Sequence, residues 1–312
     1  MSGTSHDPRG VLLMALGGPT NLADVEPYLL DLRGGRPTPP ELVEEFRERY
    51  RRIGGGSPLV AVTRAQAAAL ERTLSSEGTP VHCEVGMRHW RPHIREGFAS
   101  LVRRGATEVT GLCMTPYYSP WSVGGYLSAL DQVAAESAPA VRLHRVETWH
   151  DAPTLAEAFA RKILERIDAM TARGDPRPAL LFTAHSLPGA ADPGVEPYVR
   201  QLARVRAAVT ARLPPVRSEF AYQSVGRREG PWLLPSWEGL LERLAHDGER
   251  SVLVVPFGFV ADNLEILFDV DLEMRARAAK LGLAFDRTES LNDDPLLIDA
   301  LAHAVRGADR PG

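Results

Sequence analysis

Short apolar runs alternate along the whole chain with longer stretches in which apolar residues recur at helical spacing. The apolar runs predict buried strands at residues 11–16, 81–85, 108–114, 141–147, 179–185, 218–223, 251–257 and 284–288. Amphipathic helices are predicted between them, as at residues 64–74, 155–170 and 195–213. Because strands that alternate with helices pair in parallel, the pattern predicts an α/β fold whose sheets are covered on both faces.

The two halves of the chain repeat one pattern. Residues 104–109 lead into a strand that ends before Pro116, and residues 247–252 lead into one that ends before Pro256. This repetition predicts two similar doubly wound units that face each other across a cleft.

A boundary between the two units is expected near residues 151–153, where a proline interrupts the pattern. We therefore predict one domain at residues 1–150 and a second at residues 151–312. The last helix, at about residues 294–306, is expected to pack back on the first domain.

Composition narrows the class of protein. The 312 residues are 44% hydrophobic and 24% charged, which is typical of a soluble globular protein, and the net charge of -4 gives no reason to expect nucleic acid as a partner. No apolar run approaches the length of a membrane span, and residues 1–7 are polar, unlike a signal peptide. A cytoplasmic location is the resulting expectation.

Cysteine usage and missing motifs exclude several kinds of chemistry. Cys83 and Cys113 both lie in apolar runs, where we expect small buried side chains. Two thiols cannot supply the four ligands of an iron–sulfur cluster, and no zinc-type pairing is present. The chain also lacks a phosphate-binding loop, a His-Glu-x-x-His helix, a Gly-x-Ser-x-Gly elbow and a dinucleotide fingerprint.

His185 ends one of the predicted strands. Ligands of parallel sheets bind beyond the carboxyl ends of the strands, so a histidine there is placed to meet one. The alternative is a buried histidine bonded only to backbone.

Glu265 follows another predicted strand, and it also has two interpretations. Asp262 could cap a helix with Glu265 three residues later, which is the spacing of a capping box. However, Glu265, Asp269 and Glu273 are four residues apart and share one helical face. That row of carboxylates is either a solvated surface or a path for hydrated divalent cations.

Loops rich in glycine, proline and aromatic residues could border a ligand pocket. Two Gly/Pro-rich loops cover residues 34–40 and 54–58, and an aromatic loop covers residues 116–121. Such residues suit a flat apolar ligand, although ordinary turns have the same composition. Arg33, Arg36 and Arg49 lie on or beside the early loops and could bind ligand carboxylates.

Several ordered motifs together resemble the ferrochelatase family, and most closely its soluble coproporphyrin enzymes from bacteria. They are residues 12–19 (LLMALGGP), 53–59 (IGGGSPL), 185–188 (HSLP), 222–224 (YQS), 230–233 (GPWL) and 256–262 (PFGFVAD). The resemblance covers nearly the full length. It implies two Rossmann-like, chelatase-type domains with a porphyrin in the cleft between them, and insertion of ferrous iron with release of two protons.

The resemblance also implies roles for particular residues. His185 and Glu265 match the two catalytic positions and would contact the metal. Positions that contact the macrocycle or its propionates are matched by Leu16, Arg33, Arg49, Tyr50, Ser57 and Tyr126. A polar, metal-accessible flank is matched by His89, Asp269 and Glu273.

This sequence departs from the family pattern at two positions. Leu16 stands where some soluble members carry a tyrosine that can bind iron in the product, and leucine cannot ligate iron. Asn263 stands where a histidine often precedes the Leu-Glu pair. The absence of that histidine removes a titratable group, which alters either metal handling or only the start of the helix.

The resulting hypothesis is a ferrochelatase that makes Fe-coproporphyrin for heme biosynthesis. It needs no cofactor, because ferrous iron is a substrate. His185 is the expected proton acceptor and metal contact, with Glu265 assisting. Protoporphyrin IX as the substrate, cobalt or nickel as the metal, and a non-catalytic tetrapyrrole carrier remain alternatives. We expect a monomer that could meet an iron donor and a heme-accepting enzyme.

Overall fold

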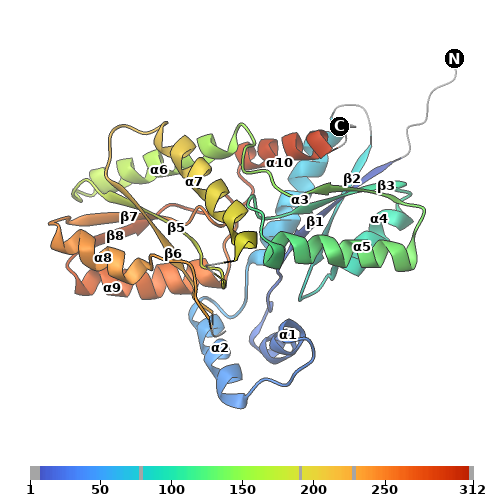
Figure 1. Cartoon of the computed structure of the whole chain (residues 1–312), viewed down its shortest axis with the longest axis horizontal. Helices are drawn as coiled ribbons and strands as arrows, with labels where there is room; N and C mark the ends of the chain where they lie inside the picture. The colour runs from blue at the N-terminus through green and yellow to red at the C-terminus, as the bar shows by residue number, and fades with distance from the viewer. Residues whose placement is uncertain (1–7, 77–79, 190–191, 227–229, 309–312) are drawn as a thin grey trace. The chain divides into compact units, whose positions relative to one another are not determined.

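The computed structural model describes residues 8–76, 80–189, 192–226 and 230–308. The polar segment at residues 1–7, on which the expectation of no signal peptide rested, lies outside these. The chain divides into two compact units, which are Met1–Thr154 together with Asn292–Gly312, and Leu155–Leu291. Each unit contains one four-stranded sheet with helices around it (Figure 1).

The first unit is built on a parallel sheet with the strand order β2-β1-β3-β4. Its strands are β1 (Arg9–Ala15), β2 (Val81–Met87), β3 (Glu108–Cys113) and β4 (Arg142–Val146). Its helices are η1 (Leu22–Asp24), α1 (Val25–Leu32), α2 (Pro40–Arg52), α3 (Leu59–Ser75), α4 (Ile94–Arg103), η2 (Pro120–Gly124), α5 (Gly125–Ser137) and α10 (Pro295–Ala308).

The second unit repeats this order as β6-β5-β7-β8, again with all strands parallel. Its strands are β5 (Ala179–His185), β6 (Ser218–Gln223), β7 (Ser251–Val255) and β8 (Ala284–Arg287). Its helices are α6 (Leu155–Ala172), η3 (Pro193–Val195), α7 (Glu196–Thr210), α8 (Trp237–His246), η4 (Glu265–Met274) and α9 (Arg275–Lys280). The prediction of two similar doubly wound units is therefore confirmed at the level of topology.

Burial on both faces explains why the central strands β1, β3, β5 and β7 are nearly continuous apolar runs, whereas the edge strands β4 and β8 are less buried and carry polar residues. In the first unit, Leu12 and Met14 of β1 belong to a core with α4 and α5. In the second unit, Leu181 and Val254 belong to a core with α8, η4 and α9, while Phe182 packs against Phe257. Because neighbouring strand residues point to opposite faces, helices on both sides require apolar residues at every position.

Two helical segments have π-helical rather than α-helical hydrogen bonding, and the sequence pattern did not predict this. They are η2, after β3, and η4, after β7. They therefore follow the third strand of each sheet, which is the same place in both units. Single π-type turns within helices are often found at functional sites, because the wider turn redirects side chains.

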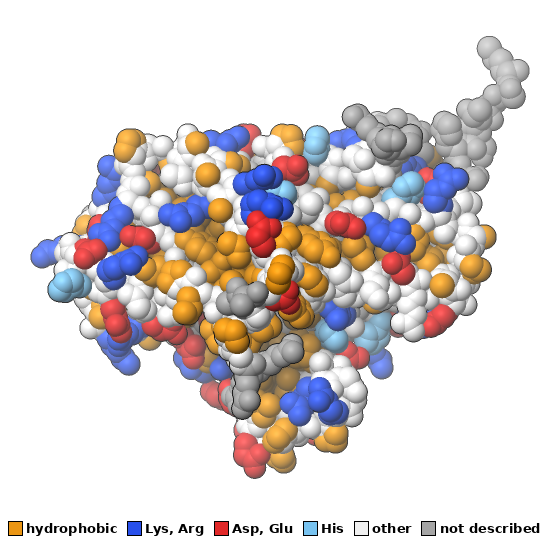
Figure 2. Space-filling view, in the orientation of Figure 1, with side chains coloured by type: hydrophobic (Ala, Val, Ile, Leu, Met, Phe, Trp, Pro, Cys, Tyr) orange, Lys and Arg blue, Asp and Glu red, His pale blue; other side chains and the backbone are white. Residues whose placement is uncertain are grey.

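No helix in the described ranges is long and apolar enough to cross a membrane. Figure 2 shows positive and negative side chains interspersed on the face it presents, not gathered into one field. This distribution agrees with the small net charge of -4.

Candidate active site

His185 is the last residue of β5, and the strand fixes its position. Its backbone pairs with Gln223 of β6, and the Tyr198 hydroxyl donates a hydrogen bond to the His185 carbonyl at 2.9 Å. Burial, with nearby charge from Tyr222 and Glu265, raises the pKa of Tyr198, so its hydroxyl remains a donor. The His185 ring is about one-third exposed, at 32%.

The two ring nitrogens of His185 have different neighbours. Nδ1 lies against the carbonyl oxygen of Ser186, which can only accept a hydrogen bond. We therefore assign the proton of neutral His185 to Nδ1, which leaves a lone pair on Nε2. The Nε2 atom lies 3.6 Å from Oε1 of Glu265. Two acceptors that face each other at this distance favour a proton or a cation between them.

Glu265 is the first residue of η4, and Asn263 fixes the start of this helical turn. The Asn263 Oδ1 atom accepts hydrogen bonds from the backbone N–H groups of Glu265, at 2.9 Å, and Ile266, at 3.2 Å. The expected cap at Asp262 is wrong, because that carboxylate instead accepts from Arg287 and Ser290. Asn263 thus has the helix-start role that was one of its two interpretations.

The carboxylate of Glu265 is not used as a capping group. Its Oε2 atom is buried and has no hydrogen-bond partner among the described residues. A buried carboxylate oxygen without a partner is costly, so such atoms usually mark a place where a ligand or ion binds. The capping-box interpretation of Glu265 is therefore wrong.

The topology explains why these two side chains meet. In the order β6-β5-β7-β8, the chain leaves β5 toward β6 and then crosses back to place β7 on the other side. The gap between β5 and β7 is thus the switch point at which open parallel sheets bind ligands. His185 ends β5, and Glu265 comes from the segment after β7, so both lie at this point.

Asp269 and Glu273 continue from Glu265 along η4, but their environments differ. Asp269 is buried, at 9% exposure, and accepts a hydrogen bond of 2.5 Å from the Ser224 hydroxyl. Glu273 is exposed. The interpretation of the three carboxylates as one solvated face is wrong for Asp269 and fits only Glu273.

Gln223 ends β6 and Ser224 follows it, and both add polar groups that residue-by-residue reasoning did not single out. Ser224 has a left-handed backbone with φ of 59°, which is uncommon for serine. Gln223 is fully buried, and its Oε1 atom lacks a hydrogen-bond partner within the described residues. The only sequence signal was their place in the YQS motif at the end of a predicted strand.

The candidates in the first unit lie around the carboxyl end of β1. Leu16 follows β1 directly and is 38% exposed, and its carbonyl accepts from the His89 N–H at 3.0 Å. The His89 Nδ1 atom lies 2.9 Å from Oδ1 of Asp31 on α1. Tyr126 is buried on α5, under the guanidinium of Arg88 at 5.6 Å from the ring centroid.

The protonation state of His89 decides whether its contact with Asp31 is an ion pair or a neutral hydrogen bond. Burial lowers the pKa of His89, with a further contribution from Arg88, although the hydrogen bond to Asp31 opposes this. Because the net shift is downward, we interpret the contact near neutral pH as a hydrogen bond from a neutral imidazole to Asp31.

Tyr50 and Ser57 meet beside the loop after β1. The Ser57 N–H donates to the Pro19 carbonyl at 2.7 Å, and Tyr50 is buried at 2% exposure. A Cβ on Gly18 would lie 2.7 Å from the Ser57 Cβ and 3.7 Å from the Tyr50 hydroxyl oxygen. The two side chains therefore approach the same glycine, which leaves them room.

The arginine candidates lie on α2 and at the end of α1. Arg49 forms an ion pair with Glu45 on α2 at 3.2 Å and is 32% exposed. Arg33 and Arg36 exchange hydrogen bonds between side chain and backbone at the end of α1.

The cysteines are structural, as expected. Both are buried. Burial raises the pKa of Cys113 to about 12 and that of Cys83 further, so neither thiol is reactive near neutral pH. Across the described residues, no group of three or more His, Cys, Asp and Glu side chains could hold a metal ion.

The two parallel four-stranded sheets with helices around them give the chain the α/β fold that is also found in chelatases of known structure. A solved structure of the sirohydrochlorin chelatase SirB from Bacillus subtilis subspecies spizizenii has the same fold, with a TM-score of 0.60 and 13% identity. The match covers 97% of this chain and 97% of that one.

The family is shown by sequence. The ferrochelatase family model matches residues 8–308, and the chain belongs to that family of metal-chelatase lyases. A ferrochelatase of Herpetosiphon aurantiacus is 37% identical over 95% of this chain and 98% of its own length. A coproporphyrin III ferrochelatase of Geobacillus thermodenitrificans is 34% identical over 95% and 94%. Metal insertion into a porphyrin in heme biosynthesis is the activity of the family.

Proposed function

We propose that this chain inserts ferrous iron into coproporphyrin III, with His185 and Glu265 as its catalytic residues. The observation that carries the proposal is the pair of acceptors at the β5–β7 switch point. They are the Nε2 atom of His185 and, 3.6 Å away, a carboxylate whose second oxygen is buried without a hydrogen-bond partner.

The reaction exchanges one divalent cation for two protons, and the pair suits both halves of the exchange. A free porphyrin loses two N–H protons as iron(II) binds its four nitrogens. Neutral His185 has a lone pair on Nε2 that can accept a proton, and imidazole is the side chain that most often serves as a general base. Glu265 keeps a free oxygen that can balance the incoming cation or take the second proton.

Iron(II) must also lose its water in steps before it reaches the ring. Imidazole and carboxylate are suitable transient ligands, because both bind first-row divalent metals without locking their geometry. In this proposal Asp269 and Glu273 form a polar flank along which the hydrated cation approaches Glu265, and His89 is a further candidate metal contact within the first unit. The exposed Glu273 and the buried Asp269 lie on the same helical segment as Glu265.

The porphyrin itself is assigned to residues of the first unit. Arg33 and Arg49 supply charges for the propionates, and Tyr50, Ser57 and Tyr126 line the site. Leu16 offers an exposed apolar surface to the flat ring. Because leucine cannot ligate iron, this position should provide no axial ligand to the iron of the product.

Coproporphyrin III is preferred over protoporphyrin IX for two reasons. Two relatives from Geobacillus are named coproporphyrin III ferrochelatases, at 34% and 33% identity. A tetracarboxylate also suits a water-soluble enzyme with several arginines beside its loops. We further propose a cytoplasmic monomer that needs no cofactor, since iron is its substrate.

Anaerobic insertion assays test the proposal. The purified protein is given iron(II) with coproporphyrin III or protoporphyrin IX, and loss of porphyrin fluorescence is followed. We expect faster insertion into coproporphyrin III, and a loss of about 10²–10⁴-fold in His185→Ala or Glu265→Gln, because each removes a group that exchanges protons or metal. His246→Ala, at an exposed residue at the end of α8, is the control.

Other outcomes would replace parts of the proposal. Faster turnover of protoporphyrin IX would change the substrate, and faster insertion of cobalt or nickel would change the metal. Tight porphyrin binding with no insertion of any of the three metals would mean a carrier. Near-full turnover by His185→Ala would refute the assignment of the proton acceptor.

A further inference from the structure

Arg287, the last residue of β8, is a buried cation in the second unit. Only 13% of its side chain is exposed, and two carboxylates of similar burial, Asp262 at 23% and Asp271 at 25%, lie against it. Burial by itself lowers the pKa of Arg287, but hydrogen bonds and charge from the two aspartates outweigh this, so its pKa is raised. The guanidinium is therefore charged near neutral pH, and two carboxylates lie against it.

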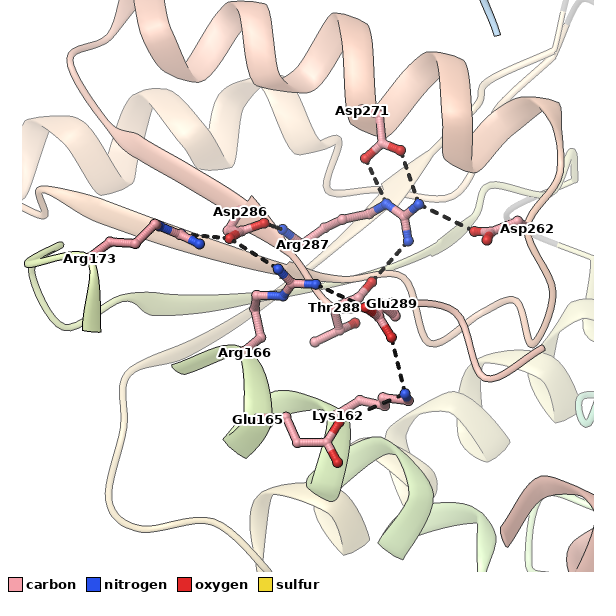
Figure 3. A network of polar contacts seen from close by, with 10 residues as sticks. All are labelled: Lys162, Glu165, Arg166, Arg173, Asp262, Asp271, Asp286, Arg287, Thr288 and Glu289. Carbon is pink, nitrogen blue, oxygen red and sulfur yellow. Dashed lines mark hydrogen bonds and ion pairs between the residues drawn. The ribbon is translucent and has the colours of Figure 1, made fainter. Parts of the chain in front are cut away.

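The contacts of Arg287 use most of its donors. Its Nε and Nη2 atoms bind the two oxygens of Asp271 at 2.6 and 3.0 Å, as a bidentate pair (Figure 3). Nη2 also donates to Asp262 Oδ1 at 3.3 Å, and Nη1 donates to the Thr288 carbonyl at 3.0 Å. Bidentate pairing of this kind fixes geometry as well as adding energy.

The two aspartates flank Glu265 in the sequence. Asp262 lies in the loop before η4, while Asp271 lies within η4, so Arg287 joins the chain on both sides of Glu265. Ser290 adds a hydrogen bond of 2.7 Å to the same oxygen of Asp262. The Asn263 cap fixes the backbone at the start of η4, and the contacts of Arg287 fix the chain on both sides of Glu265 in addition.

A second set of ion pairs anchors the end of β8 on α6. Arg166 contacts Asp286 at 3.7 Å and Glu289 at 3.4 Å, and Lys162 contacts Glu289 at 3.2 Å (Figure 3). These ion pairs join Arg166 to carboxylates on either side of Arg287 in the sequence, and those carboxylates are Asp286 and Glu289 rather than Asp262 or Asp271. They provide a natural control for contacts that stabilise β8 without reaching Glu265.

We propose that Arg287 is a positioning residue for metal insertion, which holds the Glu265 carboxylate at its distance from His185 by joining Asp262 to Asp271. The inference rests on the proposed function of Glu265. Arg287 does not touch the reacting atoms, so its effect must pass through Glu265. This dependence separates it from a purely structural ion pair.

Turnover of variants tests the dependence. Arg287→Met should lower kcat for iron insertion by about tenfold or more while the KM for porphyrin changes less than about twofold. Arg287→Lys keeps the positive charge but cannot form the bidentate hydrogen bonds of a guanidinium, so it should recover part of the loss. Arg166→Met, the matched control, should leave kcat within about twofold of the parent.

A double variant shows whether Arg287 acts through Glu265. If it does, adding Arg287→Met to Glu265→Gln should lower kcat no further, because the carboxylate that it positions is already gone. Losses that multiply in full would overturn the proposal. So would a folded Arg287→Met protein with parental kcat.

Hydrogen exchange gives a readout that does not depend on turnover. Amides of residues 262–274 should exchange faster in Arg287→Met, and not in Arg166→Met, while peptides of α7 stay unchanged. Asp271→Asn should reproduce the effect if Arg287→Met does not fold. If the parent inserts no metal, the proposed function fails, and exchange alone decides whether Arg287 holds this segment. Equal exchange in parent and variants would overturn the inference.

Discussion

At the scale of single residues, His89 illustrates how burial sets a protonation state. Its folded-state pKa is lowered, first by burial and then by Arg88 and His93, against the opposing hydrogen bond to Asp31. The unfolded chain has the ordinary value of about 6.5, so it binds this proton more readily than the folded chain does. The stability linked to neutral His89 is therefore complete above about pH 6.5, and it is lost as the pH falls through the lowered folded value.

The corresponding prediction concerns His89→Gln, in which the side-chain amide can still donate to Asp31. The urea midpoint of the parent should fall between about pH 7.5 and pH 5, and the variant should fall less, because glutamine does not titrate. His303→Gln, an exposed change on α10, is the control and should follow the parent. Parallel curves for parent and His89→Gln would contradict the prediction.

Single residues also show where sequence reasoning was limited. His185 and Glu265 could be proposed from strand-end positions, and the structure brings them to 3.6 Å. Arg287 could not be proposed, because a lone arginine after a short apolar run looks like any solvated arginine. Its role depends on contacts with Asp262 and Asp271, which are distant in the sequence and lie beside Arg287 only in the folded chain.

At the scale of elements, the close approach of β5 and β7 supports the candidate site. Gly258 follows β7, and its N–H donates to the Thr183 carbonyl of β5 at 3.1 Å. A Cβ on Gly258 would lie 2.6 Å from both Cα and Cβ of Ala184, the residue before His185. The missing side chain is thus what lets the two strand ends meet.

Gly258→Ala is therefore expected to destabilise the second unit by about 1–3 kcal/mol and to slow metal insertion, because the ends of β5 and β7 must separate. Gly239→Ala in α8 is the matched control, since its Cβ would meet no atom within 4 Å. That change should stabilise the protein by about 0.4–1 kcal/mol. Urea unfolding and insertion rates check both, and an unaffected Gly258→Ala protein would refute the packing argument.

Elements also differ in how well the sequence predicts them. All eight strands in the described residues were predicted within two residues at each end, and the central strands are the clearest because burial on both faces makes them apolar runs. The π-helical hydrogen bonding of η2 and η4 was not predicted. It depends on tertiary contacts and has no characteristic pattern of apolar and polar residues. The cap at Asn263 was assigned to its neighbour Asp262, because both side chains are good caps.

At the scale of the whole molecule, the chain path makes the two units unequal. The second unit is continuous, whereas the first takes its last helix from the end of the chain. This helix, α10, packs on α3, β3 and β4. Two hydrogen bonds of 2.7 Å hold the start of α10 and the residues before it. Gln66 donates to the Asn292 carbonyl, and Thr154 donates to the Leu296 carbonyl.

Truncation after Leu291 should therefore unfold the first unit and spare the second. Among the buried side chains that the deletion removes, four are large and apolar, namely Leu297, Ile298, Leu301 and Val305. At about 1.5–3 kcal/mol each, their loss is on the order of 6–12 kcal/mol, comparable with the whole stability of a domain. Circular dichroism during urea unfolding should show one remaining cooperative transition, and residues 155–291 alone should reproduce it. Asp299→Ala, at an exposed position of α10, should keep the parental behaviour. A truncated chain that lost only the helical signal of α10 itself would mean that the rest of the first unit is stable without that helix.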